Sequence, residues 1–193
     1  MEKPKPILLG VFFLMFCNLS VAQNQWTAEF RPGLNFPTNE IAGSDVKTGF
    51  GFEFTIAYNF SKSLGAYAGW GWNNFKANDV LGEAHVDFEE TGYTFGLQII
   101  YPTGITSLSY LLRVGAIYNH LEAEDNSGNT IANTGHDFGW QLDGGVAIDL
   151  SGGFNLRPAI RYRSLPGEFE IGTAITNADL NYISLGVGLS KTF

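Results

Sequence analysis

Charged side chains in this chain follow a spacing that would bring them to one common surface. After residue 22, every arginine falls on the same side of segments in which large apolar residues alternate with other residues, and several carboxylates share that side. These residues are Glu29, Arg31, Glu53, Arg113, Asp143, Asp149, Arg157, Arg161 and Arg163. Buried charges must be paired and hydrogen-bonded, because an unpaired charge is costly away from water. The pattern therefore predicts an interior polar network of ion pairs.

Two functions fit such a network. One is a proton path or a narrow gated pore, and the other is a structural plug of salt bridges. Counting strand registers outward from the turns places Asp143 level with Arg113 on one neighbouring segment and with Arg161 on the other. We favour the plug. The strands described below predict an eight-stranded barrel, and the interior of such a barrel is just wide enough for side chains to fill.

The other residues with catalytic or metal-binding chemistry form no recognisable site. His85, His120 and His136 all fall in polar stretches, and Ser127 near His120 belongs to no catalytic motif. His120 and His136 could hold a metal, but no fixed ligand spacing supports one. We therefore expect a protein that is not an enzyme, with no cofactor-binding or metal site.

The elements that must position these residues are strands of period two. Eight segments alternate in this way, each about ten residues long, the length of a tilted strand that crosses a bilayer. They are 26–36, 50–60, 66–72, 93–101, 108–118, 138–150, 154–162 and 180–193. Short turns at 61–63, 102–104 and 151–153 alternate with long polar stretches at 37–48, 76–90, 120–137 and 165–179. The sequence predicts an all-β fold, an eight-stranded antiparallel up-and-down transmembrane β-barrel with short periplasmic turns and four long extracellular loops.

The composition of the two strand faces decides which face points outward. One face carries most of the Phe, Trp, Tyr and Leu side chains, and the other carries glycine and nearly all the charges within the strands. An eight-stranded barrel has no room for that many large side chains inside. The aromatic face must therefore meet lipid, whereas a soluble barrel of the lipocalin type would have the reverse arrangement.

The N-terminal segment reads as a signal for secretion. Lys3 and Lys5 precede an apolar run at 7–16, and small residues end at Ala22, so residues 1–22 are expected to be a removable signal peptide and 23–193 the barrel domain. Cys17 raises the alternative of a lipoprotein, which the bulky Phe16 before it disfavours. Cleavage would remove this one cysteine and with it any disulfide or thiol chemistry.

The net charge of −8 argues against nucleic acid as a partner. Acidic residues are concentrated in the long polar stretches. Divalent cations could bridge these carboxylates to lipopolysaccharide phosphates. The alternative, which we favour, is a solvated surface that resists aggregation.

The last segment, an alternating strand that ends on Phe193, resembles the closing strand of bacterial outer-membrane β-barrels. With the seven segments before it, the chain from 23 to 193 is similar to the OmpA/OmpX-like barrels, often labelled porin-family proteins, particularly those of Bacteroidetes-type bacteria. The resemblance implies a Gram-negative cell outer membrane, contact with its lipid and lipopolysaccharide, and a monomer whose Phe193 is the assembly signal read by the barrel-assembly machinery. It implies a role in envelope integrity or surface interaction through the acidic loops. A narrow channel for small solutes is the first alternative, and a lipid A-modifying enzyme the second.

Overall fold

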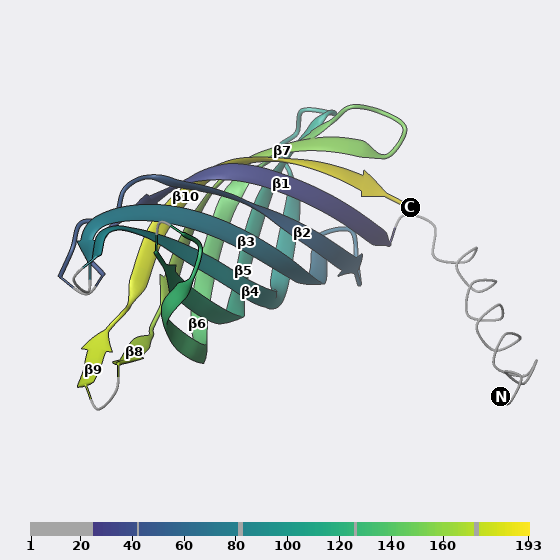
Figure 1. Ribbon diagram of the computed structural model, residues 1–193. Helices are drawn as coiled ribbons and strands as arrows, with labels where there is room; N and C mark the ends of the chain where they lie inside the picture. The colour runs from purple at the N-terminus through teal and green to yellow at the C-terminus, as the bar shows by residue number, and fades with distance from the viewer. Residues whose placement is uncertain (1–24, 42, 81–82, 126, 172–173) are drawn as a thin grey trace, which may run out of the picture.

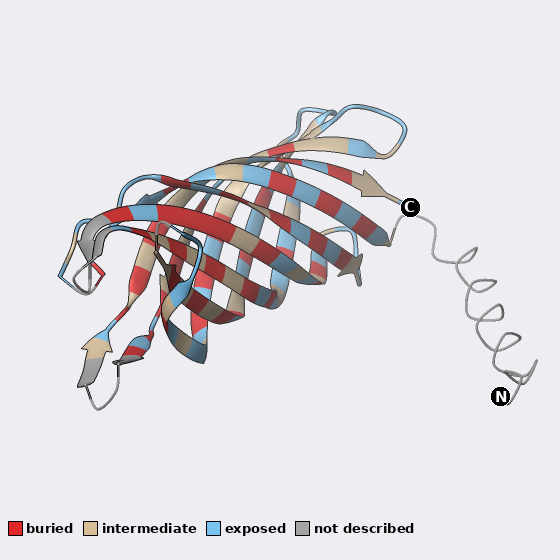
Figure 2. Ribbon diagram, viewed as in Figure 1, coloured by how far each residue is buried: buried red, intermediate tan, exposed pale blue. Residues whose placement is uncertain are grey.

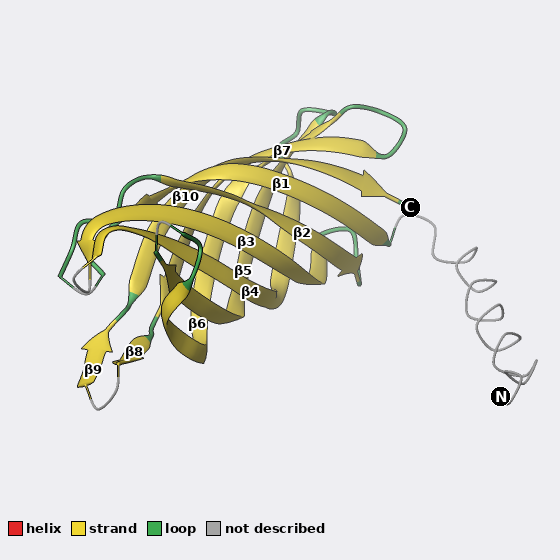
Figure 3. Ribbon diagram, viewed as in Figure 1, coloured by secondary structure: helices red, strands yellow, loops and turns green. Residues whose placement is uncertain are grey.

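The computed structural model describes residues 25–41, 43–80, 83–125, 127–171 and 174–193, and most of them lie in strands (Figure 3). The expected signal peptide, 1–22, lies outside the described residues. The strands are β1 (Trp26–Pro37), β2 (Gly49–Asn59), β3 (Leu64–Val80), β4 (Glu83–Pro102), β5 (Leu108–Glu124), β6 (Thr130–Asp149), β7 (Phe154–Leu165), β8 (Glu168–Ile171), β9 (Ala174–Asn177) and β10 (Leu180–Thr192). Among the described residues, no helix is long and apolar enough to cross a membrane.

Eight of these strands close into one barrel in the order β1-β10-β7-β6-β5-β4-β3-β2, while β8 and β9 form a separate two-stranded sheet (Figure 1). All neighbouring pairs are antiparallel, and β10 pairs with β1 to close the ring. The predicted eight-stranded antiparallel barrel is confirmed. Below, "turn end" means the end with the three short turns, where β1 begins and β10 stops, and "loop end" means the opposite one.

Four strands are much longer than the sequence patterns predicted. β3 and β5 have 17 residues each and β4 and β6 have 20, whereas β1, β2, β7 and β10 have 11 to 13. The predicted loops at 76–90 and 120–137 were wrong, because both stretches are mostly strand. The stretch 165–179 contains the β8–β9 hairpin. We had read these stretches as loops from their polarity, although alternation continues through them.

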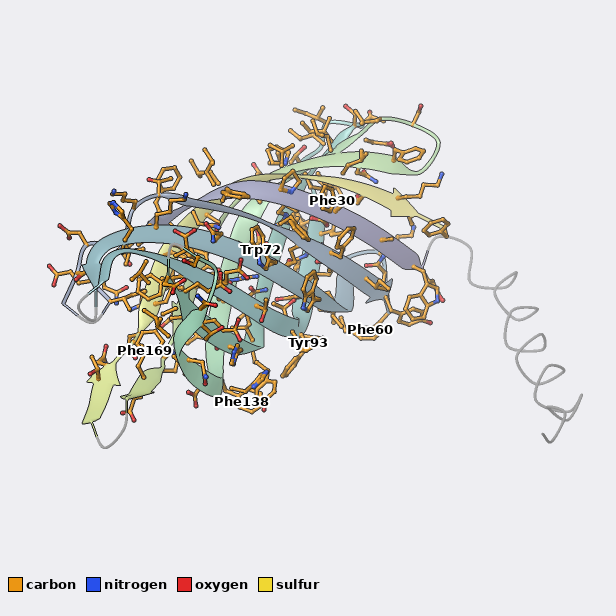
Figure 4. All side chains as sticks on the ribbon, viewed as in Figure 1. Phe30, Phe60, Trp72, Tyr93, Phe138 and Phe169 are labelled. Carbon is orange, nitrogen blue, oxygen red and sulfur yellow. The ribbon has the colours of Figure 1, made fainter. Side chains whose placement is uncertain are left out.

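The two faces of the barrel wall exchange character toward the loop end. Over most of its length the outward face is apolar, and Phe30, Phe60, Tyr93 and Phe138 are exposed on it (Figure 4). Beyond this zone Lys76 faces outward, while its neighbours in β3, Phe75 and Ala77, are buried on the inner side. The outer face is thus polar above the aromatic zone and apolar within it.

This exchange marks the level at which an apolar surrounding gives way to water. Trp72, Tyr93, Tyr118 and Phe138 are the last aromatic residues on the outward sides of β3, β4, β5 and β6 before polar residues begin. Aromatic residues favour such an interface. The long strands therefore continue past it, and with a rise of about 3.3 Å per residue, the six residues nearest the loop end extend roughly 20 Å along the wall.

Within the barrel, burial alternates along each strand, which Figure 2 shows as alternating red and pale bands. Small residues make room for the few large inward side chains. A Cβ atom at Gly115 would lie 2.4 Å from the Tyr67 hydroxyl, and one at Gly96, directly opposite, would lie 2.1 Å from the carbonyl oxygen of Val114. Gly115 therefore leaves room for the Tyr67 side chain inside the barrel, and Gly96 allows the close approach of the β5 backbone.

Candidate functional site

The candidate site is the barrel interior, which holds a network of buried charged side chains. The structure brings together eight of the nine residues predicted for the polar network, all except Asp149, and adds Glu90. We call these nine residues the charge network: Glu29, Arg31, Glu53, Glu90, Arg113, Asp143, Arg157, Arg161 and Arg163. Each is at most 6% exposed. They come from β1, β2, β4, β5, β6 and β7, so the network links most of the wall.

Nearest the turn end, Glu29 accepts hydrogen bonds from three arginines. Arg113 Nη2 lies 2.6 Å and Arg157 Nη1 2.9 Å from Glu29 Oε2, and Arg31 Nε lies 2.9 Å from Oε1. Arg113 Nε also donates to Gln98 Oε1 at 3.2 Å. One carboxylate from β1 therefore binds arginines from β1, β5 and β7.

In the middle of the barrel, Asp143 has the predicted register but one different partner. It lies opposite Arg113 on β5 and opposite Arg161 on β7, as counted from the turns. Its Oδ2 atom accepts from Arg161 Nη2 at 3.2 Å and from Arg31 Nη1. Arg113 instead reaches across the interior to Glu29, and Arg31 is the second arginine on Asp143. The expected contact between Asp143 and Arg113 was therefore wrong, and Arg31 takes that place.

Glu53 joins the middle of the network to its upper part. Its two oxygens accept from Arg161 Nη2 at 2.9 Å and Arg161 Nη1 at 3.0 Å, a bidentate pairing that fits the planar guanidinium. Arg163 Nη2 also donates to Glu53 Oε2, and Thr55 Oγ1 donates to Oε1 at 3.1 Å. Both Glu53 oxygens are therefore shared between two donors.

Glu90 lies in the stretch 76–90, and the prediction that this stretch is an extracellular loop was wrong for Glu90. It is fully buried on the inward side of β4, where its Oε2 accepts from Tyr182 OH at 3.0 Å and from Asn73 Nδ2. Arg163 Nη1 lies 3.5 Å from the same oxygen and donates to Tyr182 OH at 2.9 Å. Glu90 thus ends the charge network at the loop end.

Beyond Glu90 the interior becomes apolar. Ile41, Phe75, Ala77, Val86, Phe88, Ile117, Leu121, Ala123, Ala132, Leu165, Phe169, Ala178, Leu180 and Tyr182 form one buried cluster, which we call the apolar cap. The β8–β9 hairpin contributes Phe169, whose ring stacks on Phe88 with centroids 6.1 Å apart (Figure 4). No pattern in a single segment signalled this cap, since its residues come from six barrel strands and two connections.

The charge network and the apolar cap leave little free space. A void of about 20 Å³ lies among Arg31, Glu53, Asn73, Arg161 and Arg163. That volume holds about one water molecule.

The two remaining predicted residues lie at the turn end. Asp149 has the inward parity but is exposed, and its Oδ1 accepts from the backbone N–H of Ser151 at 2.8 Å. Phe193 is 61% exposed, and its N–H donates to the carbonyl oxygen of Trp26 at 2.9 Å. Phe193 therefore extends the β1–β10 seam by one hydrogen bond.

The three histidines lie toward the loop end. His120 is opposite His136, with ring centroids 4.8 Å apart, and its Nε2 and Nδ1 atoms lie 3.0 Å from Glu122 Oε1 and 2.8 Å from the Gly135 carbonyl oxygen. His85 lies opposite Asn78. Within the described ranges, no three His, Cys, Asp or Glu side chains are placed to bind a metal together.

Carboxylates face one another on the outer wall above the aromatic zone. Glu89 lies opposite Glu122, and Asp87 lies opposite Glu124, all on the outward sides of β4 and β5. Directly opposed like charges destabilise a strand pair. Partial desolvation and the charges of Glu89, Glu122 and Asp87 raise the pKa of Glu124.

Replacing Glu124 with glutamine is expected to increase the free energy of unfolding at neutral pH by less than about 1 kcal/mol, the range of one cross-strand pair. A raised pKa means that the folded state binds a proton more tightly than the unfolded state. The stability of the natural protein should therefore fall as the pH rises from the usual glutamate pKa of about 4.3 through the raised value. Urea unfolding at a series of pH values measures this dependence.

The Glu124→Gln variant should show a weaker fall in stability over that pH range. Glu40→Gln serves as the matched control, because Glu40 is exposed on the connection between β1 and β2. An unchanged pH dependence in Glu124→Gln would contradict the proposed repulsion.

Comparisons with known proteins agree with this architecture. The family described as outer membrane protein beta-barrel domain matches residues 9–193. Neisserial surface protein A is similar in structure, with a TM-score of 0.61, 12% identity, and coverage of 89% of this chain and 98% of that chain. The outer membrane protein OprG from Pseudomonas aeruginosa gives 0.59 and 14% identity, covering 89% and 99%.

The outer membrane protein AlkL, determined in lipid bilayers, gives a TM-score of 0.52 and 16% identity, with coverage of 89% and 90%. A search of curated protein sequences found no match. At these identities the structural likenesses establish the fold alone.

Proposed function

Because the chain belongs to the outer membrane protein β-barrel domain family, we propose that it is a closed outer-membrane barrel that serves envelope integrity or surface interaction and neither conducts solutes nor catalyses a reaction. The family match supports a location in the outer membrane. We infer that the turn end faces the periplasm, because short turns lie on that side in barrels of this kind. The observation that carries the proposal is the presence of two buried layers across the interior, the charge network and, above it, the apolar cap.

The energetics of the interior support a closed state. Opening a path through the middle requires Arg161 to leave both Glu53 and Asp143. Separating these buried partners is costly, because each charge would remain away from water without an opposite charge beside it. A second barrier lies above, where Phe88 and Phe169 are both fully buried in the cap. A gate would need two unrelated layers to open together.

The proposed surface role rests on the long strands. β3 to β6 carry outward polar and acidic side chains beyond the aromatic zone, on hydrogen-bonded strands rather than on irregular loops. Such a wall presents its carboxylates in fixed positions to lipopolysaccharide or to molecules outside the cell.

Liposome swelling tests the closed state. Vesicles that contain the folded protein should swell in isotonic solutions of small sugars or amino acids no faster than empty vesicles, while vesicles with a general porin swell quickly. Swelling above the empty-vesicle rate would contradict the proposal. In cells, a deletion strain should become more sensitive to detergent without any change in small-solute uptake.

Deleting Phe193 is expected to reduce the amount of protein assembled in the outer membrane. We propose that the barrel-assembly machinery recognises the last strand through its terminal aromatic residue. Heat-modifiable migration in gels of outer-membrane fractions measures the assembled form, and Phe193→Tyr is the control that retains an aromatic end. Normal assembly of the truncated protein would exclude this role for Phe193.

A further inference from the structure

The buried charges of the barrel do not balance. Among the described residues, the buried charged side chains are five arginines and four carboxylates. Arginine stays protonated in proteins, so one positive charge remains even when all four carboxylates are ionised. A charge away from water needs a compensating partner, and the protein side chains of the network do not supply it.

The unbalanced charge can be located. Arg31, Arg161 and Arg163 each contact two different carboxylates of the charge network. Arg113 and Arg157 each contact one carboxylate, and it is the same one, Glu29. The deficit of negative charge therefore lies at the periplasmic base of the barrel.

Of these two arginines, Arg157 is the less satisfied. Arg113 has two further partners: its Nε donates to the side-chain oxygen Oε1 of Gln98 at 3.2 Å, and its guanidinium carbon lies 5.3 Å from the centroid of the Tyr67 ring. Arg157 has a single ion pair among the described residues, from Nη1 to Glu29 Oε2 at 2.9 Å. Its Nε is buried without a hydrogen-bond partner in the described chain, and the residue is 2% exposed.

The surroundings of Arg157 are small and polar on the periplasmic side. Its cross-strand partner on β10 is Gly188, and the Glu29 carboxylate fills the space over this glycine, since a Cβ atom there would lie 2.5 Å from Glu29 Oε1. The next inward residue of β10 is the buried Ser190. Ser190 Oγ has one described contact, 3.5 Å from the Asn155 carbonyl oxygen, at the limit of a hydrogen bond. The exposed Asp149 at the rim is engaged with the turn through Ser151.

We propose that the base of the barrel binds one small monovalent anion, such as chloride, with Arg157 as its principal ligand, and that this ion completes the charge balance of the interior. The single negative charge of the ion follows from the one arginine by which the buried arginines outnumber the buried carboxylates. The small size follows from the narrow interior of an eight-stranded barrel. Entry is from the periplasm, because Arg157 lies three residues from the start of β7 whereas the apolar cap covers the other end. This site exists whether or not the barrel has a surface partner.

The test compares two sodium salts at equal ionic strength and pH. The full-length protein, folded in zwitterionic lipid vesicles, is unfolded with urea in chloride and in gluconate, an anion too large for the base. The urea midpoint of the natural protein should be higher in chloride. The difference should vanish in Arg157→Gln and persist in Lys191→Gln, whose charge lies near the same end and over the Phe154 ring on the outer side.

Equal midpoints of the natural protein in the two salts would overturn the proposal, as would a chloride effect that persists in Arg157→Gln. If Arg157→Gln fails to fold, anomalous diffraction from crystals of the natural protein in sodium bromide decides the matter. A bromide peak in contact with Arg157, together with the salt effect on the midpoint, supports the site. Absence of the peak overturns it, and a peak without the salt effect identifies an adventitious ion only and also overturns it.

Discussion

Replacing Asp143 with alanine is expected to lower the free energy of unfolding by about 3–5 kcal/mol, the usual cost of removing one partner from a buried ion pair. Asp143 is fully buried and accepts from Arg31 and Arg161, so its loss leaves five buried arginines with three carboxylates. Urea unfolding in lipid vesicles measures the change.

The matched control for this substitution is Asp149→Ala, on the same strand and with the same parity but exposed at the rim. It removes one hydrogen bond to Ser151 and should cost no more than about 1.5 kcal/mol. Adding Arg31→Ala to Asp143→Ala should recover part of the loss, because one charge of each sign is then gone and Glu29, the other partner of Arg31, keeps Arg113 and Arg157. Equal costs for Asp143→Ala and Asp149→Ala would contradict the charge network as a stabilising plug.

Replacing Phe54 with arginine is expected to cost about 2–4 kcal/mol, the penalty for an arginine on the lipid face near the bilayer midplane. Phe54 lies near the middle of β2, is 53% exposed, and packs on the outer surface against Phe30 with ring centroids 4.8 Å apart. The arginine would bring a charge into lipid where the natural side chain is apolar. Folding titrations into lipid vesicles measure this cost.

Its neighbour Thr55 provides the control, because it points inward and donates to Glu53 Oε1 at 3.1 Å. Thr55→Ser keeps that hydroxyl group and should be nearly silent. If Phe54→Arg were as silent as Thr55→Ser, the outward face of β2 would not lie in lipid.

Much of the fold follows from local patterns in the sequence. A period of two identifies the eight barrel strands. Each strand alternates outward and inward residues, as Phe54 and Thr55 do in β2. The ends of β3 to β6 were missed because polarity was taken to end the strands. Phe75 and Ala77 continue the alternation of β3, but here the apolar residues point inward and the polar residues outward. This reversal of the apolar face was mistaken for the end of the strand.

The membership of the charge network could be predicted, but its contacts could not. The alternation of the strands is enough to place Arg113 and Asp143 on the inward face. Counting residues along β5 and β6 from their short turns places the two residues opposite each other, as the structure has them. Which carboxylate each arginine reaches depends on side chains that cross the barrel, so Arg113 binds Glu29 on a strand that is not its neighbour. Glu90 shares its parity with Gly92 and Thr94, a signal that would have placed it inside had the strand been extended.

The most direct test of the closed barrel is the conductance of the purified natural protein in planar lipid bilayers. The charge network and the apolar cap predict a silent membrane over the voltage range in which a general porin conducts. Silence should persist in Asp143→Ala, because the cap remains in place, even though that variant is less stable. Reproducible conductance steps of the natural protein, abolished when it is unfolded, would contradict the account.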